Sequence, residues 1–127
     1  MRKIVIDMQN YLFADAVATA FKSSDYDIEV IRAESPRDTV ELCQIYEPFV
    51  LVMEVTGYAP WKLGERLRLR DEVKALCPNC KIALMVDSNT ERQTAKDIRD
   101  AKKDGLIDQF FYGSMSAEYL MDQIYSM

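Results

Sequence analysis

The feature that most constrains this chain is a strict alternation of short apolar runs with longer amphipathic segments. Five runs of four to six residues are rich in Val, Ile, Leu and Phe, which is typical of strands buried on both faces. The predicted strands are Lys3–Ile6, Ile28–Ala33, Phe49–Met53 with Glu54 at its end, Ile82–Val86 and Ile107–Tyr112. A segment with helical spacing follows each strand, so the order predicts a parallel sheet with helices on both faces.

The helices are recognised by their apolar spacing and their end signals. Ser35, Pro36 and Asp38 form a capping-box start, Asp87-Ser88-Asn89-Thr90 is a cluster of N-cap residues, and Gly105 ends a helix. The predicted helices are Leu12–Phe21, a second from Pro36 to Pro48, Trp61–Leu76, Glu91–Asp104 and Ala117–Tyr125. We therefore expect one α/β domain over residues 1–127.

Composition excludes several classes of function. The chain carries a net charge of −5, which argues against direct nucleic-acid binding by this domain. It has no histidine, so the commonest general base and metal ligand is missing. No run approaches the ~20 apolar residues of a membrane span, and no signal peptide precedes the first strand. We expect a cytoplasmic protein that does not act on membranes, is not an enzyme, and holds neither metal nor cofactor.

The three cysteines, Cys43, Cys77 and Cys80, do not form a disulfide framework. Cys77-Pro78-Asn79-Cys80 is a single C-x-x-C, which is too few ligands for a zinc site. Redox motifs of this kind open a helix, whereas this one closes a helix. Incidental loop thiols are the favoured interpretation, and a redox pair is the alternative.

Four segments together resemble the receiver domain of bacterial two-component response regulators. Residues 3–13, KIVIDMQNYLF, are similar to the receiver opening, and residues 48–54, PFVLVME, are similar to its third strand. Residues 81–87 are similar to the fourth strand, and residues 105–120 to the end of the domain. The resemblance implies a flavodoxin-like (βα)5 three-layer sandwich with strand order 2-1-3-4-5. It also implies phosphorelay signalling through protein contacts.

The same resemblance implies a degenerate phosphorylation site. Receivers bind magnesium with an acidic pair after strand 1, and here those positions are Met8 and Gln9. Glu54 stands at the phosphoacceptor aspartate, Val86 at the hydroxyl residue and Tyr112 at the lysine, while Gln109 replaces a switching aromatic. We therefore expect an atypical receiver, or pseudo-receiver, that is not phosphorylated in the normal way.

Two acidic residues leave alternatives open. Glu54 is either a built-in mimic of the phosphorylated state or a relic of the lost chemistry. Asp7 lies one place before the acidic pair, where strand alternation turns it away from the site, and only a local shift of the chain would bring it back.

The partner surface predicted by the resemblance is the helix 4–strand 5–helix 5 face. It would bind a protein partner or a second copy of the chain, with Tyr112, Tyr119 and Tyr125 as candidate contacts. The competing interpretation is a stand-alone assembly or dimerisation module with no signalling role. A flavodoxin is disfavoured because residues 8–11 contain no hydroxyl- or glycine-rich phosphate loop.

Overall fold

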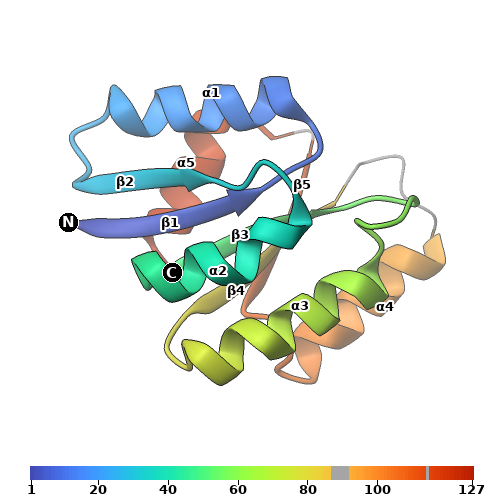
Figure 1. The fold of residues 1–127 in the computed structure, drawn as a ribbon. Coiled ribbons are helices and arrows are strands. Elements are labelled where there is room, and N and C mark those ends of the chain that lie inside the picture. The colour runs from blue at the N-terminus through green and yellow to red at the C-terminus, as the bar shows by residue number, and fades with distance from the viewer. Residues whose placement is uncertain (87–91, 114) are drawn as a thin grey trace.

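A computed structural model describes residues 1–86, 92–113 and 115–127, and strands and helices alternate along the whole chain (Figure 1). The elements are β1 Arg2–Asp7, α1 Tyr11–Lys22, β2 Ile28–Arg32, α2 Pro36–Tyr46, β3 Val50–Val55, α3 Leu63–Leu76, β4 Lys81–Val86, α4 Arg92–Lys103, β5 Gln109–Tyr112 and α5 Ala117–Tyr125. The predicted βα order is confirmed.

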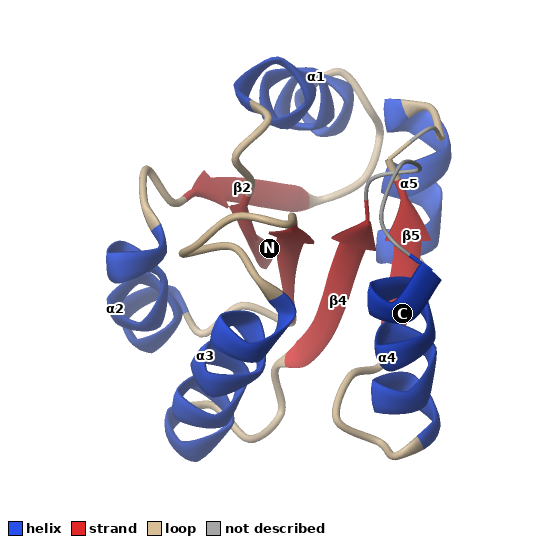
Figure 2. Ribbon diagram, turned by 90° about the vertical axis from the view of Figure 1, so that its right-hand side faces the viewer, coloured by secondary structure: helices blue, strands red, loops and turns tan. Residues whose placement is uncertain are grey.

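The five strands form one parallel sheet in the order β2-β1-β3-β4-β5, as predicted. Figure 2 looks onto the carboxyl ends of the strands, with α1 and α5 on one face of the sheet and α2, α3 and α4 on the other. At this edge, Asp7 of β1 is paired with Met53 of β3, and Glu54 of β3 with Met85 of β4. The ends of β1 and β3 therefore lie side by side.

Strand alternation divides the core in two. Ile4 and Ile6 of β1, with Val50 and Val52 of β3, pack under α1 and α5. Val5, Leu51 and Met53 pack in the second cluster, which α2, α3 and α4 cover. Successive side chains point to opposite faces of a strand, so Asp7 and Glu54 are directed to opposite sides of the sheet.

Helix ends follow the expected signals in part. Pro36 is the first residue of α2, but the Ser35 side chain makes no capping hydrogen bond, because the Asp38 N–H donates to the Ser35 carbonyl instead. The helix ends at Glu47, which has the left-handed backbone angles φ 47° and ψ 59°. Ser116 caps α5 by accepting the Tyr119 N–H. The cluster at 87–90 predicted to start α4 lies outside the described residues.

Two elements begin two residues later than predicted. In the loop before α3, Trp61 donates its N–H to the Tyr58 carbonyl and accepts the Thr56 N–H, so a turn takes the place of the expected first helical residues. Before β5, the Asp108 carboxylate accepts the Ile82 N–H at 2.8 Å. This side-chain bond replaces a ladder bond, and the strand starts at Gln109.

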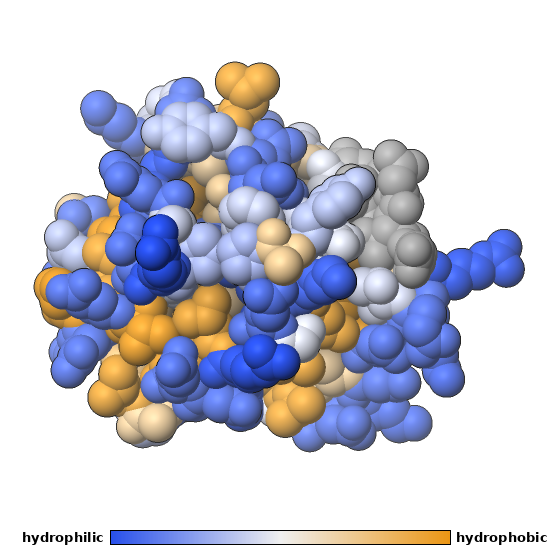
Figure 3. All heavy atoms as spheres, turned by 45° about the vertical axis from the view of Figure 1, so that its right-hand side comes forward, coloured by the Kyte–Doolittle hydropathy of each residue, from blue (hydrophilic) through white to orange (hydrophobic). Residues whose placement is uncertain are grey.

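Some apolar residues of the helices face outward. Leu12 is 84% exposed, Ile45 62% and Leu76 49%, because the buried stripes of their helices run through neighbouring positions such as Val17, Cys43 and Val73. On the face shown in Figure 3, hydrophilic side chains interrupt the apolar ones. Within the described ranges, no helix is both long enough and apolar enough to cross a membrane.

Candidate functional site

Glu54 lies at the carboxyl end of the central strand β3, where open α/β sheets bind ligands. Its side chain is nearly buried, at 9% exposed, and its Oε1 accepts the Asn10 N–H at 2.8 Å. Asn10 in turn is the N-cap of α1, because its Oδ1 accepts the Phe13 N–H. The carboxylate therefore anchors the loop that leads from β1 into α1.

Asp7 is engaged on the other side of the sheet. Its carboxylate forms a forked ion pair with Arg66 of α3, with Nη1 2.7 Å from Oδ2 and Nη2 3.2 Å from Oδ1. The hydroxyl of Thr39 in α2 donates to the same Oδ2 at 2.6 Å. Asp7 is 1% exposed and Arg66 and Thr39 are wholly buried, so the network is sealed from water.

Arg66 also ties two strand ends together. Its Nε donates to the Glu54 carbonyl at 2.7 Å, and its Nη2 donates to the Asp7 carbonyl at 3.1 Å. The Arg66 guanidinium thus binds backbone carbonyls at the carboxyl ends of both β1 and β3. The sequence analysis missed Arg66, although its position seven residues before the buried Val73 puts it on the inward stripe of α3.

The two positions that follow Asp7 supply no negative charge. Met8 is 8% exposed and packs in the core under α1 and α5, whereas Gln9 is exposed. A thioether and a neutral amide are poor ligands for magnesium, which prefers hard oxygen ligands. Among the described residues, the end of β1 therefore adds no second carboxylate beside Glu54 on its own face of the sheet.

The described residues at the ends of β4 and β5 also include no phosphate-binding group. Val86 is buried in the core on the α3 and α4 side, and it pairs with Tyr112 of β5. The Tyr112 ring meets Phe110 edge-on at 5.9 Å and is 43% exposed. Gln109 is tied to α4, because its Oε1 accepts from Lys102 Nζ at 2.8 Å. Asp87, adjacent to Val86, lies outside the described residues.

Among the described residues, no group of three or more His, Cys, Asp or Glu side chains is arranged to hold a metal ion. At the carboxyl ends of the strands, the directions of the side chains explain why no such group forms among the described residues. The carboxylates of Asp7 and Glu54 are directed to opposite faces, and the charge of Asp7 is balanced by a guanidinium.

The predicted interface tyrosines have different surroundings. Tyr119 of α5 is 53% exposed, and like Tyr112 it presents its ring to solvent. Tyr125 instead stacks on Tyr26, with centroids 4.0 Å apart, and the Arg2 guanidinium lies 5.5 Å from its centroid. Tyr125 therefore serves at least partly to fasten the end of α5.

Comparison with known proteins supplies the fold but no sequence family. No protein-family model matches the sequence, and no curated protein matches it. Among solved structures, a response regulator from Thermotoga maritima superposes with a TM-score of 0.78 at 13% identity, covering 99% of this chain and 96% of that one. Chemotaxis protein CheY4 from Vibrio cholerae gives 0.75 at 14%, covering 99% and 98%. This chain has the response-regulator receiver fold.

A third solved structure has a similar fold. A DNA-binding response regulator of the LuxR family from Staphylococcus aureus gives a TM-score of 0.73 at 17% identity, covering 99% of this chain and 98% of that one. The predicted flavodoxin-like architecture is confirmed by these superpositions over nearly the full length of the receiver fold.

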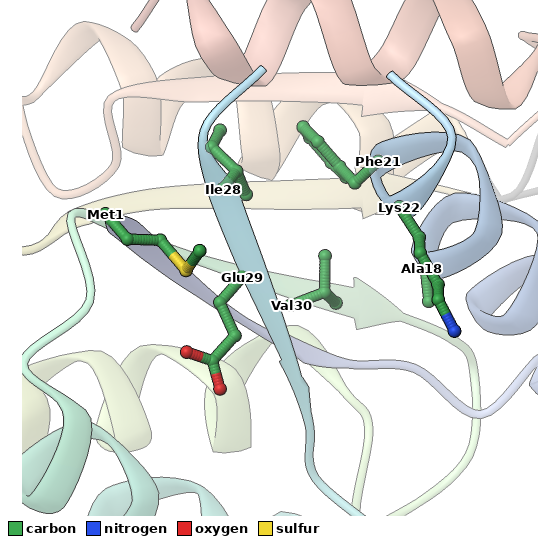
Figure 4. A pocket seen from close by; sticks show the side chains of 7 residues that line it. All are labelled: Met1, Ala18, Phe21, Lys22, Ile28, Glu29 and Val30. Carbon is green, nitrogen blue, oxygen red and sulfur yellow. The ribbon is translucent and has the colours of Figure 1, made fainter. Parts of the chain in front are cut away.

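A surface hollow lies at the opposite end of this receiver fold from Glu54. It measures about 430 Å³ and is lined by Met1, Ala18, Phe21, Lys22, Ile28, Glu29 and Val30, beside the edge strand β2. In Figure 4 the Glu29 carboxylate and the Lys22 ammonium lie on opposite sides of β2 and do not converge. The hollow therefore offers no cluster of polar groups for catalysis or for binding a charged ligand.

Proposed function

We propose that this chain is an atypical receiver domain of a two-component response regulator, which signals through protein contacts without normal aspartyl phosphorylation. The observation that carries the proposal is the sealed network of Asp7, Arg66 and Thr39. The acidic residue of β1 that could have served as a metal ligand is bound to a guanidinium and a hydroxyl on the far side of the sheet.

Phosphoryl transfer to a carboxylate depends on positioned cations that balance the charge of the phosphoryl oxygens. At the same edge of the sheet as Glu54, the described residues provide the thioether of Met8, the buried Val86 and the phenol of Tyr112. None of these groups holds magnesium or offsets a phosphoryl charge. The Glu54 carboxylate is also committed to the Asn10 N–H.

Two roles for Glu54 fit this proposal. As a fixed negative charge it would hold the domain in one signalling state, and as a relic it would only secure the loop after β1. The bond from Asn10 supports a structural contribution in either case. Changing the charge while keeping the bond separates the two roles, and Glu54→Gln does this.

The partner surface that we propose is the face formed by α4, β5 and α5. Tyr112 and Tyr119 are exposed on β5 and α5, and exposed tyrosine is enriched at protein interfaces. The partner is a protein of the same signalling system or a second copy of this chain, and the domain acts in the cytoplasm without binding DNA itself.

Incubation with acetyl phosphate and magnesium, followed by intact-mass measurement, tests phosphorylation. We expect no phospho-adduct, while a receiver with a complete acidic site, treated in the same tube, gains one phosphoryl group. A stable adduct on this chain would overturn the proposal, and peptide mapping would identify the acceptor.

The second candidate is an assembly module without a signalling role, which the exposure of Tyr112 and Tyr119 also favours. Sedimentation of wild type, Tyr112→Ser and Tyr119→Ser separates the two. A concentration-dependent dimer that both variants disrupt, and that Glu54→Gln leaves unchanged, would favour assembly. Tyr58→Ser is the matched control, because Tyr58 is 74% exposed on the loop before α3.

A further inference from the structure

The three cysteines lie close together near the amino ends of the strands, at the opposite end of the sheet from Glu54. Cys43 lies near the end of α2, Cys77 directly follows α3, and Cys80 directly precedes β4. The Cys77 thiol donates to the Cys43 carbonyl at 3.3 Å, and the Cys80 thiol donates to the Lys81 carbonyl at 3.5 Å. Cys43 and Cys80 are buried in the same core cluster. Residues far apart in sequence thus form one thiol cluster, with all three sulfurs reduced.

The backbone between Cys77 and Cys80 is a tight turn. The Cys80 N–H donates to the Cys77 carbonyl at 3.0 Å, which is the bond between the first and fourth residues of a β-turn. Such a turn brings its end Cα atoms within about 7 Å of each other, and disulfides span Cα separations of about 4.4–6.8 Å. The turn therefore already holds the two residues near bonding distance.

The two thiols differ in access. Cys77 is partly exposed, whereas Cys80 is 1% exposed and Cys43 is fully buried. A reagent from solution therefore meets Cys77 first, and Cys80 is reached only by another protein sulfur.

The surroundings also set the protonation of each sulfur. The hydrogen bond with Cys43 lowers the pKa of the Cys80 thiol, burial opposes this, and the nearby Lys74 ammonium assists it. Lys74 is held at the turn by its bond to the Pro78 carbonyl at 3.2 Å. The bond with Cys80, together with burial, raises the pKa of Cys43, so Cys43 stays a protonated donor. Burial also raises the pKa of Cys77.

We propose that Cys77 and Cys80 are a thiol–disulfide exchange pair that reacts with small-molecule disulfides of the glutathione type. This function is independent of the receiver-like edge, because the cluster lies at the other end of the strands.

The exchange takes two balanced steps. The Cys77 thiol loses its proton, and the thiolate attacks one sulfur of glutathione disulfide, which forms a Cys77–glutathione bond and releases one glutathione thiolate. The Cys80 thiolate then attacks the Cys77 sulfur, which forms the Cys77–Cys80 disulfide and releases the second glutathione thiolate. One disulfide is reduced and one is formed, so no other oxidant is required.

A tryptic digest distinguishes the pair from every other product. Cys77 and Cys80 share the peptide 75–81, and Cys43 lies alone in the peptide 38–62. The full chain is incubated with glutathione disulfide, unfolded in guanidinium so that the buried thiols become accessible, alkylated and digested. We expect peptide 75–81 to carry no alkyl group and to be two hydrogens lighter than its reduced form, while peptide 38–62 is alkylated. Because burial raises the pKa of Cys77, the reaction should be faster at about pH 9 than at about pH 7.

Variants test each role. Cys80→Ser should accumulate glutathione on Cys77, and Cys77→Ser should leave peptide 75–81 alkylated at Cys80.

Three results would overturn the proposal. They are a cross-link between peptides 38–62 and 75–81, an unchanged peptide 75–81 in wild type, and an unmodified Cys77 in Cys80→Ser. Far-ultraviolet circular dichroism of each variant shows whether it is folded, so that a loss of reaction is not confused with a loss of structure.

Discussion

The Arg66 guanidinium binds the Asp7 carboxylate at 2.7 Å in a site that water does not reach. Removing one member of a buried ion pair leaves an uncompensated charge and costs about 3–5 kcal/mol. We therefore expect Arg66→Met to lower the free energy of unfolding by that amount in urea denaturation. Arg68→Met is the matched control, because Arg68 lies two residues away on the same helix, is exposed, and should change stability by less than about 0.5 kcal/mol.

Replacing Asp7 and Arg66 together should cost less stability than replacing Arg66 alone. In the double variant Asp7→Leu with Arg66→Met, no buried charge remains, so most of the lost stability should return. A double variant no more stable than Arg66→Met alone would show that the hydrogen bonds of Arg66 to the two strand ends, rather than its charge balance, dominate.

Thr39 should stabilise the fold through its hydroxyl rather than its shape. Its Oγ1 donates to the ionised Asp7 at 2.6 Å, and a hydrogen bond to a charged group contributes about 1.5–3 kcal/mol. Thr39→Val keeps the volume and loses the donor, so it should cost that amount in urea denaturation. Thr39→Ser keeps the donor and should cost only about 1 kcal/mol for the lost methyl. Equal losses in the two variants would contradict this assignment.

Glu54 should tolerate neutralisation better than truncation. Glu54→Gln retains an acceptor for the Asn10 N–H, whereas Glu54→Ala removes it and should cost about 1–2 kcal/mol. Amide hydrogen exchange of the first turn of α1 measures the local effect, because that loop is tied to Glu54. Equal protection in Glu54→Ala and wild type would show that the bond does not hold the loop.

The Tyr26 phenol should ionise at a higher pH than an ordinary tyrosine. Its hydrogen bond to the Asp122 carboxylate, at 2.8 Å, raises its pKa, and burial and the charge of Asp122 act in the same direction. The neutral phenol is the form that the fold stabilises. This contribution is therefore complete below the unfolded pKa of about 10 and is lost as pH rises through the higher folded value.

Alkaline difference spectra of wild type against Tyr26→Phe isolate this titration. Asp122→Asn should move it to lower pH, while Asp100→Asn, on the distant helix α4, should leave it unchanged. A Tyr26 titration that Asp122→Asn does not move would contradict the stated cause.

Sequence periodicity predicted the strands and helices well, because each is defined by local spacing, and the last helix, Ala117–Tyr125, agrees with the structure. The strand order, which the resemblance to receiver domains implied, is also confirmed. Strand alternation correctly predicted the side of the sheet on which Asp7 lies.

Contacts between residues far apart in the sequence could not be predicted from local spacing. Arg66 is separated from Asp7 by 59 positions, and the spacing of α3 alone describes it as one more charged residue on a polar helix. The start of β5 likewise depends on the Asp108 side chain bonding to β4, and the thiol cluster depends on α2 meeting the end of α3. Side-chain hydrogen bonds of this kind produce no periodic pattern in the sequence.

The division of β1 between two cores limits how this domain could acquire a metal-binding edge in evolution. Moving Asp7 to the face of Glu54 would require the strand to slip by one residue, and every side chain of β1 would then change sides. Ile4 and Ile6 would leave the core under α1 and α5, and Arg66 would lose its partner. Substitutions at positions 8 and 9 could add acidic side chains without this slip, and Asp7 would keep its structural bond to Arg66.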